Sequence, residues 1–276
     1  MKEDGTMGRW TGIGFVAAAS LLLALLPWER HGLLASCLGA HPLGPEGIWA
    51  GWSLAPEILL PLVALGFVVQ RRIRCGDSWW LAPGLLLLVL ALVSPLCRLA
   101  ATLVSAHMLQ FMLLCIAAPM LLAPLAAASR LPLRPAAVIY GAAIWIWHLP
   151  PVYEAIVNHA ALHLAAVVLL LGASVLFWRS VLEAAKERPL AALVVLLLTM
   201  CHTGILGAWL TFGARPWYPF LEDGVALWTL SLLEDQQLAG LLMWVVGGAA
   251  YLLAALHVCA RAFLRNPGAG FAGSRS

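Results

Sequence analysis

Eight long apolar runs dominate the sequence and decide what kind of fold it can adopt. A helix needs roughly 20 mostly apolar residues to cross a bilayer. The runs cover residues 10–28, 54–70, 79–97, 105–127, 133–149, 160–178, 190–211 and 237–263. Lipid offers no partner to an unpaired backbone group, and the runs lack the alternating pattern of barrel strands. The sequence therefore predicts an all-α fold, a polytopic transmembrane helical bundle of about eight spans.

The overall composition agrees with a membrane protein. Of the 276 residues, 63% are hydrophobic and 11% are charged, whereas a soluble domain carries about 25% charged residues. Such a chain cannot hide its apolar side chains in one water-facing core, so most must face lipid or neighbouring helices. No basic stripe with interleaved aromatic residues is present, so we expect membrane lipid and no nucleic acid as a partner.

Basic residues are divided unevenly between the two sets of expected loops. Because short cytoplasmic loops carry an excess of Lys and Arg, the richer set marks the cytoplasmic side and places both termini there. Three basic residues lie in the poorer set, Arg30, Arg98 and Arg215. Thirteen lie in the richer set: Lys2, Arg9, Arg71, Arg72, Arg74, Arg130, Arg134, Arg179, Lys186, Arg188, Arg261, Arg265 and Arg275.

Two features concern the outer side of the predicted topology. The first run follows Lys2 and Arg9 as in a signal peptide, but no convincing small-residue cleavage site ends it, so we expect a retained helix, with cleavage as the alternative. Among the six cysteines there is no CxxC pair, and only Cys37 and Cys97 are expected on one outer surface. A bridge between these two is left open.

The histidines are concentrated towards the outer face. Ionisable residues inside a membrane are costly, and they usually mark function. His257 alone falls towards the cytoplasmic end. The other seven lie in the first outer loop, at outer helix ends or in outer helix halves: His31, His41, His107, His148, His159, His163 and His202. This distribution predicts a histidine-rich site near the outer surface.

His159 and His163 are one helical turn apart, which would place both rings on one side, about 6 Å apart along the axis. Two imidazoles at that spacing can bind one metal ion. The alternative is that His159 caps the helix in interfacial water while His163 is a satisfied buried histidine.

The fourth run places His107 and Gln110 on one stripe, beside a stripe with Met108, Met112 and Cys115. Imidazole, thioether and thiolate are ligands that suit Cu(I). Methionine also fills gaps in apolar packing, and we favour that interpretation for the two methionines.

Further along the chain, His202 lies within the seventh run, where it is either a ligand or a partner in an interhelical hydrogen bond. Glu234 and Asp235 open the eighth run, as acids at a helix N-terminus do, and an additional role in holding a histidine tautomer is compatible. The sequence has no GxSxG, HExxH or P-loop motif, so we expect no enzyme activity.

Several of these segments together resemble the CtaG-like cytochrome c oxidase assembly factors. The resemblance runs from about Gly51 to about His257 and rests on "ALVSPLCRLAATLVSAHMLQFMLL", "WIWHLPPVYEAIVNHAALH", "LLGASVLFW", "HTGILGAWLTFGARPWYP" and "EDQQLAGLLMWVVGG". It implies a bundle of about seven helices over residues 51–265 in a bacterial inner membrane. Residues 1–50 would then form an accessory N-terminal helix and outer loop, and residues 266–276 a short cytoplasmic tail.

The resemblance implies a non-enzymatic factor that assists copper delivery to, or insertion into, a haem-copper oxidase at the periplasmic face. Its cofactor would be Cu(I), and its partners would be terminal oxidase subunits or copper chaperones. A copper permease and a bis-His haem-binding membrane protein are the alternatives. The resemblance implies that His107, His163 and His202 are metal ligands. His159 is a further candidate ligand on the basis of its spacing alone. In a supporting role the resemblance nominates Gln110, His148, Asp235 and Gln236.

The chain departs from the family pattern at two places. The family usually has a second histidine one turn after that of the fourth helix, where this chain has Phe111. It also usually has a Glu-His pair after the histidine of the sixth helix, where this chain has Ala166 and Val167. The expected metal site therefore lacks two of its imidazoles.

Overall fold

The computed structural model describes Cys37 and residues 41–76, 78–126 and 131–265. Within these residues the chain is helical and contains no strand. The α-helices are α2 (Pro56–Arg74), α3 (Leu81–Leu92), α4 (Pro95–Leu99), α5 (Val104–Met112), α6 (Ala118–Leu122), α7 (Leu133–Trp147), α8 (Pro150–Asn158), α9 (Ala160–Glu187), α10 (Pro189–Phe212), α11 (Glu222–Ala226), α12 (Leu232–Leu241) and α13 (Gly248–Arg265). Short 3-10 and π segments complete them: η2 (Pro45–Ala50), η3 (Leu113–Ala117), η4 (Ala123–Leu125), η5 (Pro219–Leu221) and η6 (Leu242–Gly247).

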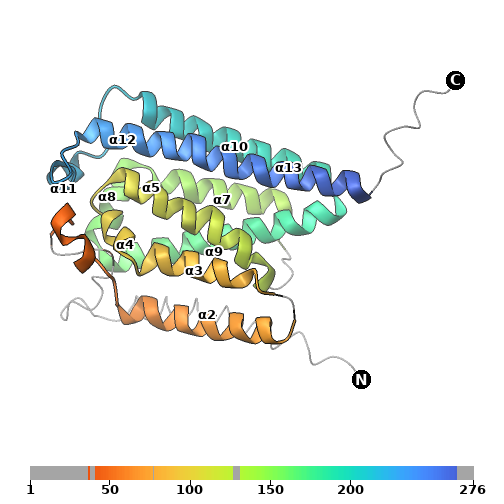
Figure 1. Cartoon of the computed structure of the whole chain (residues 1–276). Helices are drawn as coiled ribbons and strands as arrows, with labels where there is room; N and C mark the ends of the chain where they lie inside the picture. The colour runs from red at the N-terminus through yellow and green to blue at the C-terminus, as the bar shows by residue number, and fades with distance from the viewer. Residues whose placement is uncertain (1–36, 38–40, 77, 127–130, 266–276) are drawn as a thin grey trace.

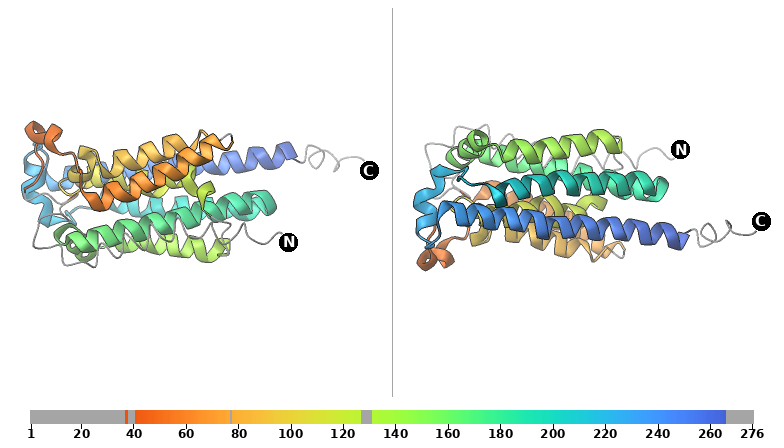
Figure 2. Two further views of the ribbon diagram at one scale, coloured as in Figure 1. Left: turned by 90° about the horizontal axis from the view of Figure 1, so that it is seen from below. Right: turned by 90° about the horizontal axis from the view of Figure 1, so that it is seen from above.

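The long helices lie side by side in one bundle, and successive ones run in opposite directions (Figures 1 and 2). Helices α5 and α6 continue through η3 as one rod, and α12 and α13 continue through η6 as another. The short helices α4, α8 and α11 gather at one end, which we call the α11 end (Figure 1). Helix α13 finishes at the opposite end, which we call the Arg265 end.

The helices follow the predicted runs closely. The expected span at 10–28 lies outside the described residues, and each of the other seven ranges coincides with a helix or rod. Two of these fall short of a standard span, because α2 ends in three arginines and α3 has 12 residues. Among the described residues, four rods are long and apolar enough to cross a membrane: Val104–Leu125, Ala160–Glu187, Pro189–Phe212 and Leu232–Arg265. Helices α7 and α8, bent by 76° at their junction, make a fifth if they count as one span. The polytopic, all-α class is confirmed, and the number of eight spans stays a prediction.

The two ends of the bundle differ in charge. At the α11 end the described basic residues are Arg98, on α4, and Arg215, just after α10. Cys97, also on α4, forms a disulfide with Cys37, the bridge that the sequence left open. Towards the Arg265 end lie Arg71, Arg72, Arg74, Arg134, Arg179, Lys186, Arg188, Arg261 and Arg265. The predicted charge asymmetry therefore runs along the bundle axis.

A proline inside the rod formed by α5, η3 and α6, which we call the central rod, shows how the bundle provides hydrogen-bond partners for freed backbone groups. Pro119 has no N–H, so the carbonyl of Cys115 lacks its usual partner one turn later. The hydroxyl of Tyr140 donates to this oxygen at 3.0 Å and the indole of Trp178 donates at 2.8 Å. The Tyr140 hydroxyl also shares a hydrogen bond of 2.6 Å with that of Tyr251. One freed carbonyl thus joins three neighbouring rods to the central one.

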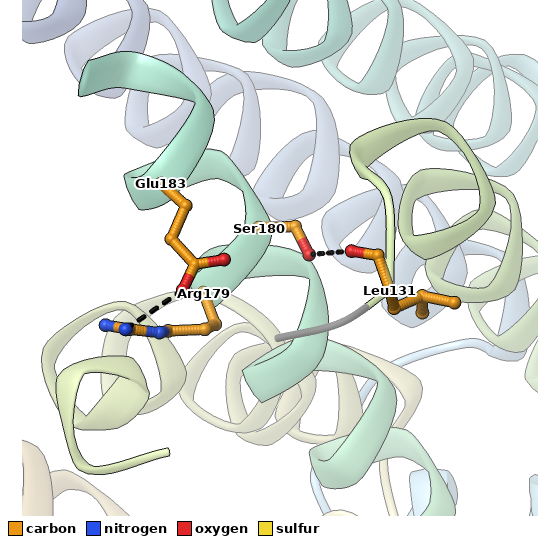
Figure 3. Close-up of polar contacts among 4 residues, drawn as sticks. All are labelled: Leu131, Arg179, Ser180 and Glu183. Carbon is orange, nitrogen blue, oxygen red and sulfur yellow. Dashed lines mark hydrogen bonds and ion pairs between the residues drawn. The ribbon is translucent and has the colours of Figure 1, made fainter. Parts of the chain in front are cut away.

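Side chains near the Arg265 end join α9 to the chain segment before α7 (Figure 3). The hydroxyl of Ser180 donates to the carbonyl of Leu131 at 3.3 Å. One turn of the same helix carries an ion pair between Arg179 and Glu183, with a nitrogen–oxygen distance of 2.9 Å. Both side chains are mostly buried, so this pair contributes more than an exposed one would.

Glycines allow α10 and α12 to meet backbone to backbone. Gly207 on α10 faces Gly240 on α12, and Thr211 follows Gly207 by one turn. A Cβ atom on Gly240 would clash with the hydroxyl of Thr211, and would lie 2.5 Å from its amide nitrogen and 2.6 Å from the carbonyl oxygen of Gly207. Close approach of small residues is how helices associate in lipid, where hydrophobic burial no longer drives packing.

Replacing Gly240 by Ala should destabilise the folded protein by about 1–3 kcal/mol, because the extra methyl group meets rigid backbone atoms. Thermal unfolding of the purified protein in detergent measures this. Gly248→Ala is the matched control, since a Cβ atom at Gly248 meets nothing within 4 Å and the substitution carries the same gain in helix propensity. Equal unfolding temperatures for the two variants would contradict the close contact.

Candidate functional site

The centre of the candidate site is His107, on α5 near the α11 end of the bundle. Its side chain is 4% exposed. Aromatic rings surround it: the ring centre of Tyr153 lies 4.6 Å away, that of Trp147 5.8 Å and that of Phe111 6.0 Å. The imidazole of His148 lies at 6.0 Å. His107 is therefore held in a closed aromatic environment next to a second imidazole.

Two histidines from other helices share this region. His148 is the residue that ends α7, and His163 lies in the first turns of α9. Both are buried; the ring of His148 lies next to that of His107, and His163 lies within electrostatic range of it. The structure thus gathers three buried imidazoles from three helices, and we call this group the His107 cluster.

Buried ring nitrogens that lack a hydrogen-bond partner are concentrated in the His107 cluster. Eight buried side-chain nitrogen or oxygen atoms in the described bundle lack a hydrogen-bond partner. Four belong to the cluster: Nε2 of His107, Nε2 of His148, and both ring nitrogens of His163. A fifth is the indole nitrogen of Trp147, which stacks on His107. Because a buried polar atom without a partner costs about 1–3 kcal/mol, this concentration points to a function for the nitrogens.

The tautomer of His148 follows from its own helix. Nδ1 lies 2.8 Å from the carbonyl oxygen of Ile144, which can only accept a hydrogen bond. Nδ1 of His148 must therefore carry the proton, and the lone pair of a neutral ring is then on Nε2. This nitrogen is the buried one without a partner. His148 is thus held in the form that can bind a metal ion.

The backbone of His148 is fixed from the loop that follows α10. The Tyr218 hydroxyl donates to the carbonyl oxygen of His148 at 3.0 Å. Tyr218 is buried, and burial raises the pKa of its hydroxyl group, so the group keeps the proton that this hydrogen bond needs. The loop therefore supports the cluster from the α11 end.

Asp235 holds the N-terminus of the helix that carries His107. Its carboxylate, fully buried on α12, accepts from the amides of Val104 at 2.6 Å and Ser105 at 3.2 Å, and from the Ser105 hydroxyl at 2.5 Å. The N-cap residue of α5 makes no side-chain cap of its own, so Asp235 caps this helix from a distance. A negative charge at the positive end of the helix dipole adds to the effect. Asp235 does not cap α12 as its position suggested: Ser231 does so, in a capping box with Glu234.

The two glutamines have structural roles near the cluster. Gln110 donates to the carbonyl oxygen of Ala91 at 2.8 Å, where Pro95, one turn later, offers no N–H. This bond joins α5 to α3. Gln236 accepts from the amide of Trp217 at 2.6 Å and donates to the carbonyl oxygens of Leu210 and Arg215 at 3.2 and 3.4 Å. It fixes the loop after α10.

Two positions that differ from the family pattern lie beside the histidines. The ring centre of Phe111 is 4.9 Å from that of His148, in an edge-on contact. Val167 follows His163 by one turn and is also buried. Apolar side chains thus occupy the places where the resemblance implies further imidazoles.

The predicted pairing of His159 with His163 is not formed. His159 lies at the break between α8 and α9, where its backbone is extended (φ −130°, ψ 108°). Its ring is exposed, and Nδ1 lies 2.9 Å from the carbonyl oxygen of Ala155, on the preceding helix. His159 is the N-cap residue of α9, so its carbonyl oxygen accepts the first bond of that helix, from the His163 amide at 2.8 Å. Its own extended backbone leaves its ring bonded to α8 instead of beside the ring of His163.

His202 also lies apart from the cluster. It faces α7 beside Gly141 and Trp145, whereas His107 meets that helix at Trp147 and His148. The Trp145 indole donates to Nδ1 of His202 at 3.2 Å. Of the two interpretations given to His202, the interhelical hydrogen bond is the one observed.

The sulfur-containing stripe of the central rod packs into the core. Met108, Met112 and Cys115 are all buried within the hydrophobic cluster of the bundle. Across the described residues, no group of three or more His, Cys, Asp or Glu side chains converges so as to hold a metal ion. The His107 cluster therefore offers nitrogens in proximity and not a complete coordination shell.

A family model described as cytochrome c oxidase caa3 assembly factor (Caa3_CtaG) matches residues 63–136 and 132–264. The chain belongs to this family. The matched regions contain all three histidines of the cluster, together with Asp235 and Gln236. No curated protein and no solved structure matches the chain significantly. The resemblance inferred from the sequence motifs is therefore confirmed by the family model.

The position of His148 beside His107 was not predicted from the sequence. The resemblance nominated His148 for a supporting role, and the sequence places it at the end of a short run that closes on two prolines. Those prolines also provide the signal: they end α7 and turn the chain by 76°, which leaves the last residue of the helix beside α5.

Replacing Asp235 by Ala should destabilise the protein by about 3 kcal/mol, because two buried amides lose their acceptor. Asp235→Asn keeps one acceptor oxygen and should cost less. Thermal unfolding in detergent gives both values, with Asp223→Ala as the control on an exposed acid of α11. A loss for Asp235→Ala no larger than that of the control would contradict the capping of α5.

Proposed function

We propose that this protein is a non-enzymatic assembly factor of the inner membrane that holds Cu(I) at the His107 cluster while copper is delivered to a haem-copper cytochrome c oxidase. Membership of the assembly-factor family supports the general role. The observation that carries the copper role is the group of four unpartnered imidazole nitrogens on His107, His148 and His163. Copper is the cargo in this proposal.

The nitrogens fit the cargo in kind and spacing. Imidazole is a ligand that suits copper. Two imidazoles that share an ion at about 2 Å from each nitrogen have ring centres about 6 Å apart, and those of His107 and His148 are 6.0 Å apart. Because three described ligands do not converge, binding would use few ligands, which Cu(I) accepts and which favours release to a partner.

The α11 end is proposed as the periplasmic face, with both termini in the cytoplasm. The basic residues concentrate towards the Arg265 end, as they do on the cytoplasmic side of membrane proteins. The disulfide between Cys37 and Cys97 lies at the α11 end, and disulfides persist in the periplasm but rarely in the cytoplasm. Copper chaperones or oxidase subunits would therefore reach the cluster from the periplasm.

Haem would compete for the same nitrogens, but the surroundings of His107 favour a smaller ligand. Three aromatic rings lie with their centres 4.6–6.0 Å from its own ring centre. A macrocycle between His107 and His148 would have to displace them. We therefore expect the absorption spectrum of the purified protein to show no Soret band.

Replacing His107 or His148 by Leu should reduce copper retained by the purified protein at least about tenfold, the effect of losing one ligand worth about 1.4 kcal/mol or more. His163→Leu, which removes a neighbouring imidazole, should reduce it less. Maturation of the oxidase in cells lacking the parent gene should fall in parallel. Metal analysis and oxidase activity in membranes measure the two effects. His159→Leu makes the same chemical change at an exposed histidine and should leave both unchanged. The copper role would be refuted if the parent protein carried no copper under copper-replete conditions. It would also be refuted if the oxidase matured fully with each of the three variants.

Phe111→His offers a test by gain of function. Phe111 contacts both His107 and His148, so an imidazole there adds a ligand at the existing cluster. We expect copper to be held about tenfold more tightly in competition with a Cu(I) chelator, as one additional ligand implies. Phe111→Leu removes the ring without adding a ligand and should not tighten binding. Identical affinities for the two variants would show that the cluster does not bind the metal.

A further inference from the structure

A groove on the lipid-facing side of the bundle lies between α7 and α10, away from the His107 cluster. Its volume is about 290 Å³, and its lining is almost entirely apolar. Val138 and Leu198 on its walls are 70% and 61% exposed. Residues of its lining include Ala137, Val138, Gly141, Trp145, Leu198 and His202. We call it the α7–α10 groove.

His202 presents a hydrogen-bond donor in this groove. The indole of Trp145 can only donate, so Nδ1 of His202, which receives that bond at 3.2 Å, must carry the lone pair. The ring is then neutral and its proton is on Nε2. No described residue accepts from this N–H group. Trp145 thus fixes His202 as a donor without an acceptor.

The depth of His202 decides what could accept from it. Helix α10 rises about 20 Å from Pro189 to His202 and about 15 Å from His202 to Phe212, at about 1.5 Å per residue. The donor therefore lies near the middle of a hydrocarbon layer about 30 Å thick. Lipid head groups and ester carbonyls lie at the edges of that layer. Hydrocarbon offers no acceptor, so an unpaired N–H group at this depth is costly.

Small residues form one wall of the groove. Ala137 and Gly141 are one turn apart on α7, and small residues at this spacing let another helix approach closely. A Cβ atom on Gly141 would lie 3.4 Å from Nε2 of His202, in the tight range for such a contact. The absence of a side chain at Gly141 therefore keeps the donor accessible.

We propose that the α7–α10 groove docks a transmembrane helix of a partner protein, which presents a Ser or Thr hydroxyl or a freed backbone carbonyl to Nε2–H of His202. A helix supplies what the groove lacks, an acceptor at mid-membrane depth and an apolar surface that fits between Val138 and Leu198. The inference rests on the proposed function in one respect: the partner helix belongs to the polytopic oxidase subunit under assembly.

Site-specific photocrosslinking tests the docking. The full-length chain carries benzoylphenylalanine in place of Val138 and is produced in membranes with the catalytic subunit of the haem-copper oxidase. The matched control carries the same group in place of Leu169 on α9, which is 67% exposed and lies outside the groove. We expect an adduct with the oxidase subunit from position 138 at several times the yield from position 169.

Variants of His202 test the hydrogen bond. In the Val138 crosslinking background, His202→Phe keeps a ring but removes the donor, and it should lower the yield about three- to tenfold, the effect of one interhelical hydrogen bond. His202→Gln keeps an N–H group near the position of Nε2 and should retain most of the yield. Gly141→Leu fills the groove, and it should reduce copurification of the otherwise unmodified chain with the oxidase subunit.

Other outcomes overturn the inference. Adducts with a second copy of this chain, or with lipid or quinone alone, would assign the groove to those occupants, and equal yields from positions 138 and 169 would remove it as a docking site. A deletion strain separates this from the proposed function. Normal oxidase maturation without the chain refutes the proposed function itself. If oxidase maturation is impaired in the deletion strain but position 138 gives no adduct, only docking in the α7–α10 groove is refuted.

Discussion

The bundle depends on one constraint: backbone groups freed at helix breaks inside the membrane must find partners within the protein. Asp235 receives the amides that open α5, and Gln110 reaches the carbonyl that Pro95 leaves free. Tyr140 and Trp178 do the same where Pro119 interrupts the central rod. Each break thereby becomes a link between two or more helices. The links fix how far each helix is rotated and shifted against its neighbours, and so they fix where the histidines meet.

Against this background the His107 cluster is an exception. Ser53, Glu57 and Arg179 each leave one buried atom unpartnered, but in the cluster His107, His148 and His163 do so together. Apolar packing would be satisfied equally well by Leu or Phe at these positions, as Phe111 and Val167 beside them illustrate. The four ring nitrogens without partners on these imidazoles carry the cost of buried polarity and return no hydrogen bond. A ligand that receives lone pairs from these nitrogens would balance that cost, and this is the physical reason why we propose copper for the site.

The sequence predicted the helices well and the site only in part. Apolar runs locate helices because span length and hydrophobicity are properties of a single segment, so seven ranges coincide with observed rods. A site depends on which helix faces meet, and that is set by links between distant segments, such as Asp235 to α5 across 131 positions. The spacing of His159 and His163 failed for a local reason, since the chain breaks its helix at His159. The histidine distribution indicated the end of the bundle at which His107, His148 and His163 lie, but only the fold could show that His148, and not His202, lies beside His107.

His148 and His202 show how neighbouring groups give one residue type two opposite roles. At His148, a backbone carbonyl accepts from Nδ1 and leaves a lone pair on Nε2, facing a buried cluster. At His202, an indole donates to Nδ1 and leaves a proton on Nε2, in a groove open to lipid. The first arrangement suits metal binding and the second suits recognition of an acceptor on another helix. Metal handling and client docking can therefore be placed at separate sites on α7, which contributes Trp147 and His148 to one and Gly141 and Trp145 to the other. The two proposals are therefore compatible, because copper and the client helix would occupy different parts of α7.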